Sequence, residues 1–252
     1  MDVATALGLF ALAAMVGTYG TVIGAGGGFV LIPGMVLLFG FEGVEAVGTG
    51  AVALAVIGAT GAAAYDRQGL VARPVAGWFA LGAVPIALLA GWQLAGRVDS
   101  DLFIAVLGFL LIGLAVFVLV VHSRGGVAPE ERPTQAGPLL GLGGAIGLLS
   151  GMFGVGGGLL TVPFMARVQR MGPHRAAATT AATSMVTGAA GSVGHALAGN
   201  VRWGSAAVMI AGAVVGSLTG ARLAGRMSER VILALLAAGL VAAGVPLIVR
   251  AL

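Results

Sequence analysis

Ten apolar segments follow one another along the chain, and none shows the period-two alternation of a membrane β-strand. They cover residues 3–23, 29–40, 45–65, 74–96, 102–122, 138–153, 159–166, 176–195, 203–221 and 231–249. Three of them, at 29–40, 138–153 and 159–166, are shorter than the roughly 20 residues that a straight membrane-spanning helix needs. The pattern predicts an all-helical membrane protein in which the short segments are half-helices that break at membrane depth.

Two glycine runs lie beside these short segments. The first is Gly24-Ala25-Gly26-Gly27-Gly28 and the second is Gly154-Val155-Gly156-Gly157-Gly158, and each is followed by a proline, Pro33 or Pro163. Glycine exposes its backbone N–H and adopts dihedrals that other residues resist, so such a run inside apolar sequence marks a place where backbone meets a partner.

The two runs belong to an internal repeat. An ungapped offset of 130 residues superposes them and also pairs Ala46 with Ala176 and Thr49 with Thr179. Further identities follow in the same register, at Gly58/Gly188, Gly61/Gly191, Gly69/Gly199, Val71/Val201 and Gly82/Gly212. We interpret this as a duplication, with a first repeat over residues 1–123, a cytoplasmic linker over 124–137 and a second repeat over 138–252.

The arginines indicate how the segments cross the membrane, because cytoplasmic loops carry more of them. If each glycine run lay within one spanning helix, the thirteen arginines would divide six against seven. If each run is the tip of a hairpin that returns to its own side, ten share one side and three, Arg97, Arg202 and Arg250, lie opposite. The second arrangement gives each repeat an odd number of crossings, so the repeats are inverted. The predicted fold is an all-α polytopic membrane protein of two inverted repeats, each a broken glycine-tipped hairpin (3–40 and 138–166) followed by three transmembrane helices.

Composition agrees with a multi-pass membrane protein and excludes several chemistries. Of 252 residues, 59% are hydrophobic and 9% charged, which no soluble surface matches. The absence of cysteine from the sequence rules out disulfides and thiolate metal sites. The net charge of +4 is scattered at helix ends, so no nucleic-acid partner is expected. We expect neither a metal nor a cofactor.

The glycine runs are candidates for an anion site. Free N–H groups at the start of a half-helix, together with its positive dipole end, attract anions. The candidate donors are Gly26, Gly27 and Gly28 in the first run and Gly156, Gly157 and Gly158 in the second. Neither run continues into the Gly-Lys-Ser/Thr of a phosphate loop. The alternative interpretation is tight packing of a sharp turn.

Hydroxyl side chains are candidates for the remaining hydrogen-bond donors around the anion. Thr180, Thr183, Ser184 and Thr187 recur at three- and four-residue spacing and share one helix face. We assign Thr49, Thr179, Thr183 and Ser184 to the site, where they would donate to a small anion without adding permanent charge. The alternative is that these hydroxyls bond back to their own helix or to a neighbour.

Three further residues could serve coupling or gating. His195 and Tyr65 occupy equivalent positions in the repeat, and His195 could couple transport to protons, although a lone histidine there could equally be an interfacial hydrogen-bonder. Arg175 could attract anions at the mouth or act as a topology charge. An intramembrane hydrolase that uses Ser184 or Ser150 with His195 lacks an activating motif.

These motifs resemble the sulfite exporter TauE/SafE family of anion permeases, also called the TSUP family. The resemblance rests on the paired Gly-x-Gly-Gly-Gly runs, on the Ala-x-x-Thr positions Ala46 to Thr49 and Ala176 to Thr179, and on Gly69-x-Val71 and Gly199-x-Val201. It implies a prokaryotic inner-membrane transporter of small sulfur-containing or carboxylate-containing anions, such as sulfite, sulfonates, sulfoacetate or thiosulfate. We expect a secondary transporter that works by alternating access, with one repeat rocking against the other. A passive anion channel is the alternative.

Overall fold

The structure is a computed structural model that describes residues 1–94, 97, 100–123, 133–154, 156–224, 227 and 229–251. Over these residues the predicted all-helical class is confirmed, with no β-strand among them. The helices are α1 (Val3–Ile23), α2 (Gly28–Phe39), α3 (Gly43–Asp66), α4 (Arg73–Leu89), the π-helix η1 (Ala90–Leu94), α5 (Ser100–Ser123), α6 (Ala136–Phe153), α7 (Gly158–Arg167), α8 (Pro173–Leu197), α9 (Trp203–Ala224) and α10 (Glu229–Ala251).

Each predicted apolar segment therefore coincides with a helix. The predicted segment 74–96 is α4 continued by η1, and its last two residues lie outside the described part of the chain. Most of the predicted linker, residues 124–132, is also outside it, and α6 already begins at Ala136.

Several helices are long and apolar enough to cross a membrane. Within the described residues there are five: Val3–Ile23, Gly43–Asp66, Arg73–Leu94, Ala136–Phe153 and Trp203–Ala224. The half-helix Gly28–Phe39 is apolar but shorter. This composition fits a multi-pass membrane protein.

The chain leaves the helical path between α1 and α2, at the first glycine run. Helix α1 begins at Asp2, whose carboxylate accepts the Thr5 N–H, and it ends at Gly24 in the left-handed conformation, φ 71°. The chain turns sharply, with the Gly26 N–H donating to Gly20 O, and α2 starts after Gly27. The second hairpin repeats the design: α6 ends at Gly154, φ 61°, and α7 begins at Gly158.

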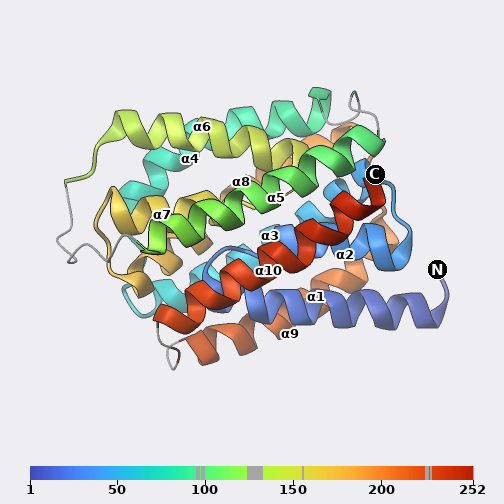
Figure 1. The fold of residues 1–252 in the computed structure, drawn as a ribbon, viewed down its shortest axis with the longest axis horizontal. Coiled ribbons are helices and arrows are strands. Elements are labelled where there is room, and N and C mark those ends of the chain that lie inside the picture. Colours follow the sequence, from blue (N-terminus) through green and yellow to red (C-terminus); the bar gives the residue numbers. More distant parts are fainter. Residues whose placement is uncertain are drawn as a thin grey trace.

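The helices pack in an order that interleaves the two halves of the sequence. Helix α1 packs along α9, α9 contacts α3, α3 packs on α8, α8 contacts α4, and α4 packs along α6. In Figure 1, α4 and α6 form one edge of the bundle, α1 and α9 form the opposite edge, and α5 and α10 run side by side between them. Both termini lie at the same end of the molecule (Figure 1).

The closest helix pairs depend on glycine. A Cβ placed on Gly216 of α9 would lie 2.1 Å from the Ala14 carbonyl oxygen of α1, and a Cβ on Gly82 of α4 would lie 2.2 Å from the Leu140 carbonyl oxygen of α6. No real Cβ approaches so closely, so these positions admit only glycine without rearrangement. Small residues at lipid-embedded interfaces let backbones approach in this way.

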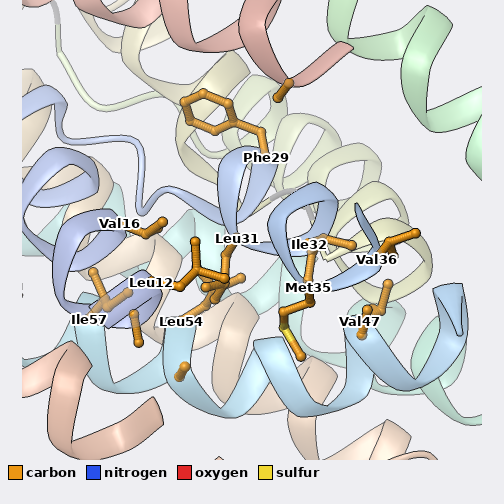
Figure 2. Packing of buried hydrophobic residues seen from close by; sticks show 14 of the residues in the cluster. Leu12, Val16, Phe29, Leu31, Ile32, Met35, Val36, Val47, Leu54 and Ile57 are labelled. Atoms are coloured by element: carbon orange, nitrogen blue, oxygen red, sulfur yellow. The ribbon is translucent and has the colours of Figure 1, made fainter. Parts of the chain in front are cut away.

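Helix α2 is buried because it is apolar all round. Figure 2 shows Leu31 and Met35 pointing toward Leu54 of α3, while Phe29 points to the other side of α2. The Phe29 ring lies 6.0 Å from that of Tyr19, centroid to centroid. This packing fixes the half-helix, and with it the glycine turn at its start.

Candidate functional site

The two glycine turns lie against each other. We call residues 24–28 the first glycine turn and residues 154–158 the second, of which Val155 lies outside the described residues. A Cβ on Gly158 would lie 2.0 Å from Ala25 Cα, so the two backbones are in direct contact. A Cβ on Gly156 would lie 3.8 Å from the Gly28 amide nitrogen. Both half-helix N-termini, α2 and α7, therefore start beside this contact.

Ser184 of α8 lies against both turns. Its Oγ would be 3.4 Å from a Cβ on Gly26 and 3.7 Å from a Cβ on Gly157. The side chain is 2% exposed, and its Oγ has no hydrogen-bond partner among the described residues. A buried hydroxyl without a partner is costly, so its presence at the junction of two glycine turns suggests a ligand.

The neighbouring hydroxyls of α8 differ in how their single protons are used. Thr183 Oγ1 donates to Thr180 O at 2.9 Å, and Thr187 Oγ1 donates to Thr183 O at 3.1 Å. These two protons are therefore engaged within the helix. Thr180 Oγ1, like Ser184 Oγ, is buried and has no partner among the described residues. Thr180 and Ser184 stand one turn apart on the same helix face.

Thr49 and Thr179 are placed elsewhere. Thr49 Oγ1 accepts the Arg202 N–H at 3.0 Å, and Thr179 Oγ1 accepts the Ala72 N–H at 3.0 Å. These amides lie at the starts of α9 and α4, where helix N–H groups lack intrahelical acceptors. The two hydroxyls thus cap neighbouring helices, and their recorded hydrogen bonds do not go to a glycine turn.

Tyr65, His195 and Arg175 also lie apart from Ser184. Tyr65 OH donates to Thr21 O at 3.0 Å, and His195 Nε2 donates to Gly151 O at 2.8 Å. Arg175 lies in the first turn of α8, nine residues before Ser184, or about 13 Å along the helix at 1.5 Å per residue. His195 is eleven residues after Ser184, about 16 Å, too far for a serine–histidine nucleophile pair.

The hydroxyl groups of the candidate site come from α8 and not from the equivalent helix of the first half, α3. The positions of α3 equivalent to Thr183, Ser184 and Thr187 are Ala53, Leu54 and Ile57, all buried in the apolar cluster around α2. The polar groups therefore come from α8 and from the two turns.

Two residues at or near the site were missed from the predicted set. Thr180 was noted in the hydroxyl-rich stretch but not assigned, although its spacing of four from Ser184 places it on the same face. Thr21, in the last turn of α1, is 2% exposed and has an Oγ1 without a partner among the described residues. The sequence feature that could have selected Thr21 is its position three residues before Gly24, in the last turn of α1.

This arrangement offers neutral hydrogen-bond donors in a buried setting. The described residues contain no group of three or more His, Cys, Asp or Glu side chains that could hold a metal. Hydroxyls, amides and two helix N-termini are suited to holding a small anion. Helices that are interrupted beside a buried polar site are typical of membrane transport proteins, so the fold and the site place the chain in that class.

The comparisons identify the family. The model of the family described as "Sulfite exporter TauE/SafE" matches residues 9–247, so the chain belongs to this family. A "Probable membrane transporter protein YunE" of Bacillus subtilis is 26% identical, over 95% of this chain and 96% of that protein. A "Probable membrane transporter protein MamO" of Magnetospirillum gryphiswaldense is 27% identical, over 98% of this chain and 45% of that protein. These relatives are named as membrane transporters rather than as enzymes. No solved structure gives a significant match to the chain.

Proposed function

We propose that this protein is a secondary transporter that carries a small organosulfur or sulfur oxyanion, of the sulfite, sulfonate, sulfoacetate or thiosulfate class, by alternating access. The observation that carries the proposal is Ser184 Oγ, which is buried where both glycine turns meet and has no hydrogen-bond partner in the described part of the chain. The anion binds on the Ser184 side of that contact, because Gly158 and Ala25 touch directly.

The donor set supports a small oxyanion. The Ser184 hydroxyl and the Gly28 and Gly158 amides at the starts of α2 and α7 can each donate to a different oxygen, and none adds a fixed charge. The predicted donor Gly26 is excluded from this set, because its N–H already donates to Gly20 O. A neutral site suits a carrier, because a buried permanent cation could hold an anion too tightly to release it. The family description adds sulfite as a candidate substrate.

The proposed architecture is two inverted repeats, residues 1–123 and 138–252, joined by the linker 124–137. Contacts that recur with the halves exchanged support it. Gly58 lies against the Met185 backbone and Gly188 against that of Ala55, and these pairs correspond at the offset of 130 residues. The two threonine caps and the Tyr65 and His195 bonds correspond in the same way. Inverted repeats with broken helices place a transporter's site at their interface.

The moving units combine helices from both repeats. The glycine-to-carbonyl contacts hold α1 to α9 and α4 to α6, and each of these pairs contains one helix from each half. Separating the repeats as rigid bodies would break both pairs. We therefore assign α1 with α9 to one unit and α4 with α6 to the other, with α3 and α8 between them.

The protein works in a lipid bilayer, and we place it in a prokaryotic inner membrane. The arginine distribution puts the linker 124–137 on the cytoplasmic side and both termini opposite. The common position of the termini in Figure 1 is consistent with this topology.

A thermal-shift screen of the purified protein tests the proposal. The wild-type protein is heated with sulfite, sulfonates, sulfoacetate, thiosulfate and simple carboxylates at matched ionic strength. A ligand that binds the folded state raises the apparent Tm as its concentration rises. We expect at least one sulfur oxyanion to do so at lower concentration than acetate. A panel in which none raises Tm more than chloride would contradict the substrate class.

A further inference from the structure

Tyr65 and His195 make the same contact in the two halves of the molecule. The Tyr65 hydroxyl donates to the carbonyl of Thr21, and His195 Nε2 donates to the carbonyl of Gly151. Each acceptor lies three residues before the glycine that caps the end of the first helix of its pair, Gly24 after α1 or Gly154 after α6. Both donor side chains are buried, at 3% and 0% exposure.

These carbonyls need an external donor. The last four carbonyls of a helix have no full set of intrahelical partners, and no water is present in the bilayer core to replace them. Thr21 O accepts the Gly24 N–H at 3.2 Å, at the start of a turn that leaves the helical path. The donor from the next helix, α3 or α8, adds a fixed anchor where the chain changes direction.

We propose that Tyr65 and His195 are positioning residues that fix the ends of α1 and α6 and thereby aim the glycine N–H groups that follow. A phenol and an imidazole share this place in the repeat. A phenol keeps its proton near neutral pH, so the shared property is a hydrogen-bond donor rather than a titrating group. His195 acts here as a donor through Nε2.

Glycines of two neighbouring elements leave space for the His195 side chain. A Cβ on Gly91 of η1 would lie 3.0 Å from His195 Cδ2, and a Cβ on Gly48 of α3 would lie 3.1 Å from His195 Cβ. Both distances are shorter than ordinary van der Waals contact. The ring is therefore confined on the η1 side and the base of the side chain on the α3 side, which keeps Nε2 directed at Gly151.

Hydrogen–deuterium exchange of the ligand-free protein tests this proposal. The variants are Tyr65→Phe, which removes one oxygen atom, His195→Ala, which removes the donor, and His195→Gln, whose amide nitrogen can reach the place of Nε2. A neutral hydrogen bond of this kind corresponds to about fivefold in a local opening equilibrium. We expect Tyr65→Phe to accelerate exchange by about that factor in the peptide covering the first glycine turn alone. His195→Ala should accelerate the second turn alone, and His195→Gln should stay within about twofold of the wild type.

Three outcomes would overturn the proposal. In the first, the exchange rate at a glycine turn does not change when the side chain that donates to that turn's helix is removed. In the second, the exchange rates of both turns rise equally in each variant, which indicates general destabilisation. His195→Gln could also behave as His195→Ala does, which would show that the imidazole itself is required, as for a proton relay. The role of the aimed N–H groups rests on the proposed function, but the exchange measurement uses no anion. A failure of anion binding would therefore leave this result intact.

Discussion

Ser184 differs from the neighbouring threonines of α8 in whether its hydroxyl proton is already donated to a carbonyl of the same helix. The hydroxyls of Thr183 and Thr187 donate to carbonyls of their own helix, whereas Ser184 Oγ has no partner among the described residues and lies against Gly26 and Gly157. An anion needs donors, and a hydroxyl whose proton is already engaged is a poor one. Ser184, with Thr180 one turn away, is therefore the strongest anion donor among the candidate hydroxyls.

Replacing Ser184 by alanine should weaken anion binding. A hydrogen bond to a charged group is worth about 1.5–3 kcal/mol, so Ser184→Ala should raise Kd about tenfold or more. Thr183→Val is the matched control, because it removes a hydroxyl that already donates to Thr180 O within α8, and its Kd should stay within about twofold of the wild type. Calorimetric titration with the tightest anion from the screen measures both. Equal affinities in Ser184→Ala and the wild type would remove Ser184 from the site.

The sequence selects candidate residues for the site more readily than it places them in space. The glycine runs and Ser184 could be selected because repetition and helical spacing mark them. Thr49 and Thr179 were assigned to the site on the same grounds, but their hydroxyls cap α9 and α4. Arg202, the partner of Thr49, is 153 residues away in sequence, and spacing along one helix says nothing of such a partner.

At the level of secondary structure, the lengths of the apolar segments and the glycine runs between them were sufficient to place the helices. The broken hairpins follow from the same signals, because a half-helix of ten or twelve residues cannot span a bilayer. The π-helix η1 was not predicted. Such turns depend on tertiary packing, and here Gly91 of η1 lies against His195. The choice of neighbours, α1 with α9 and α4 with α6, also needed the structure.

Glycine at the α1–α9 contact should be essential for stability. Gly216→Ala would place a Cβ 2.1 Å from Ala14 O, and overpacking of this kind costs about 1–3 kcal/mol. Gly77→Ala in α4 is the control, since a Cβ there has no neighbour within 4 Å and alanine favours the helix. Thermal unfolding in detergent should show a lower apparent Tm for Gly216→Ala and an unchanged or higher one for Gly77→Ala. The reverse order would contradict the close α1–α9 packing.

At the scale of the molecule, the interleaved packing decides which helices move together. Because the sequence holds no cysteine, an introduced pair carries its only thiols. A Cβ on Gly212 of α9 would lie 3.2 Å from Ala13 Cβ of α1, within reach of a disulfide, but also 2.3 Å from Phe10 O. The two helices must therefore separate slightly to accept the pair, and the reduced variant must first be shown to fold and transport.

Locking α1 to α9 should leave transport intact. The double variant Ala13→Cys with Gly212→Cys is oxidised, reconstituted into liposomes, and compared with the same sample after reduction. If the two helices belong to one unit, both samples should carry substrate at rates within about twofold of each other, since the bond removes no motion between units. Transport that is lost on oxidation and recovered on reduction would mean that the repeats move as separate bodies.

The central claim is that a single small anion is carried at the Ser184 junction by a protein that exposes it to one side at a time. Counterflow in proteoliposomes tests it directly, with labelled sulfite or the best sulfur oxyanion of the screen outside and unlabelled anion inside. We predict saturable uptake that is accelerated by internal anion, with a raised KM in Ser184→Ala. Flux that rises linearly with concentration, ignores internal anion and is unchanged in Ser184→Ala would contradict the account and indicate a passive channel.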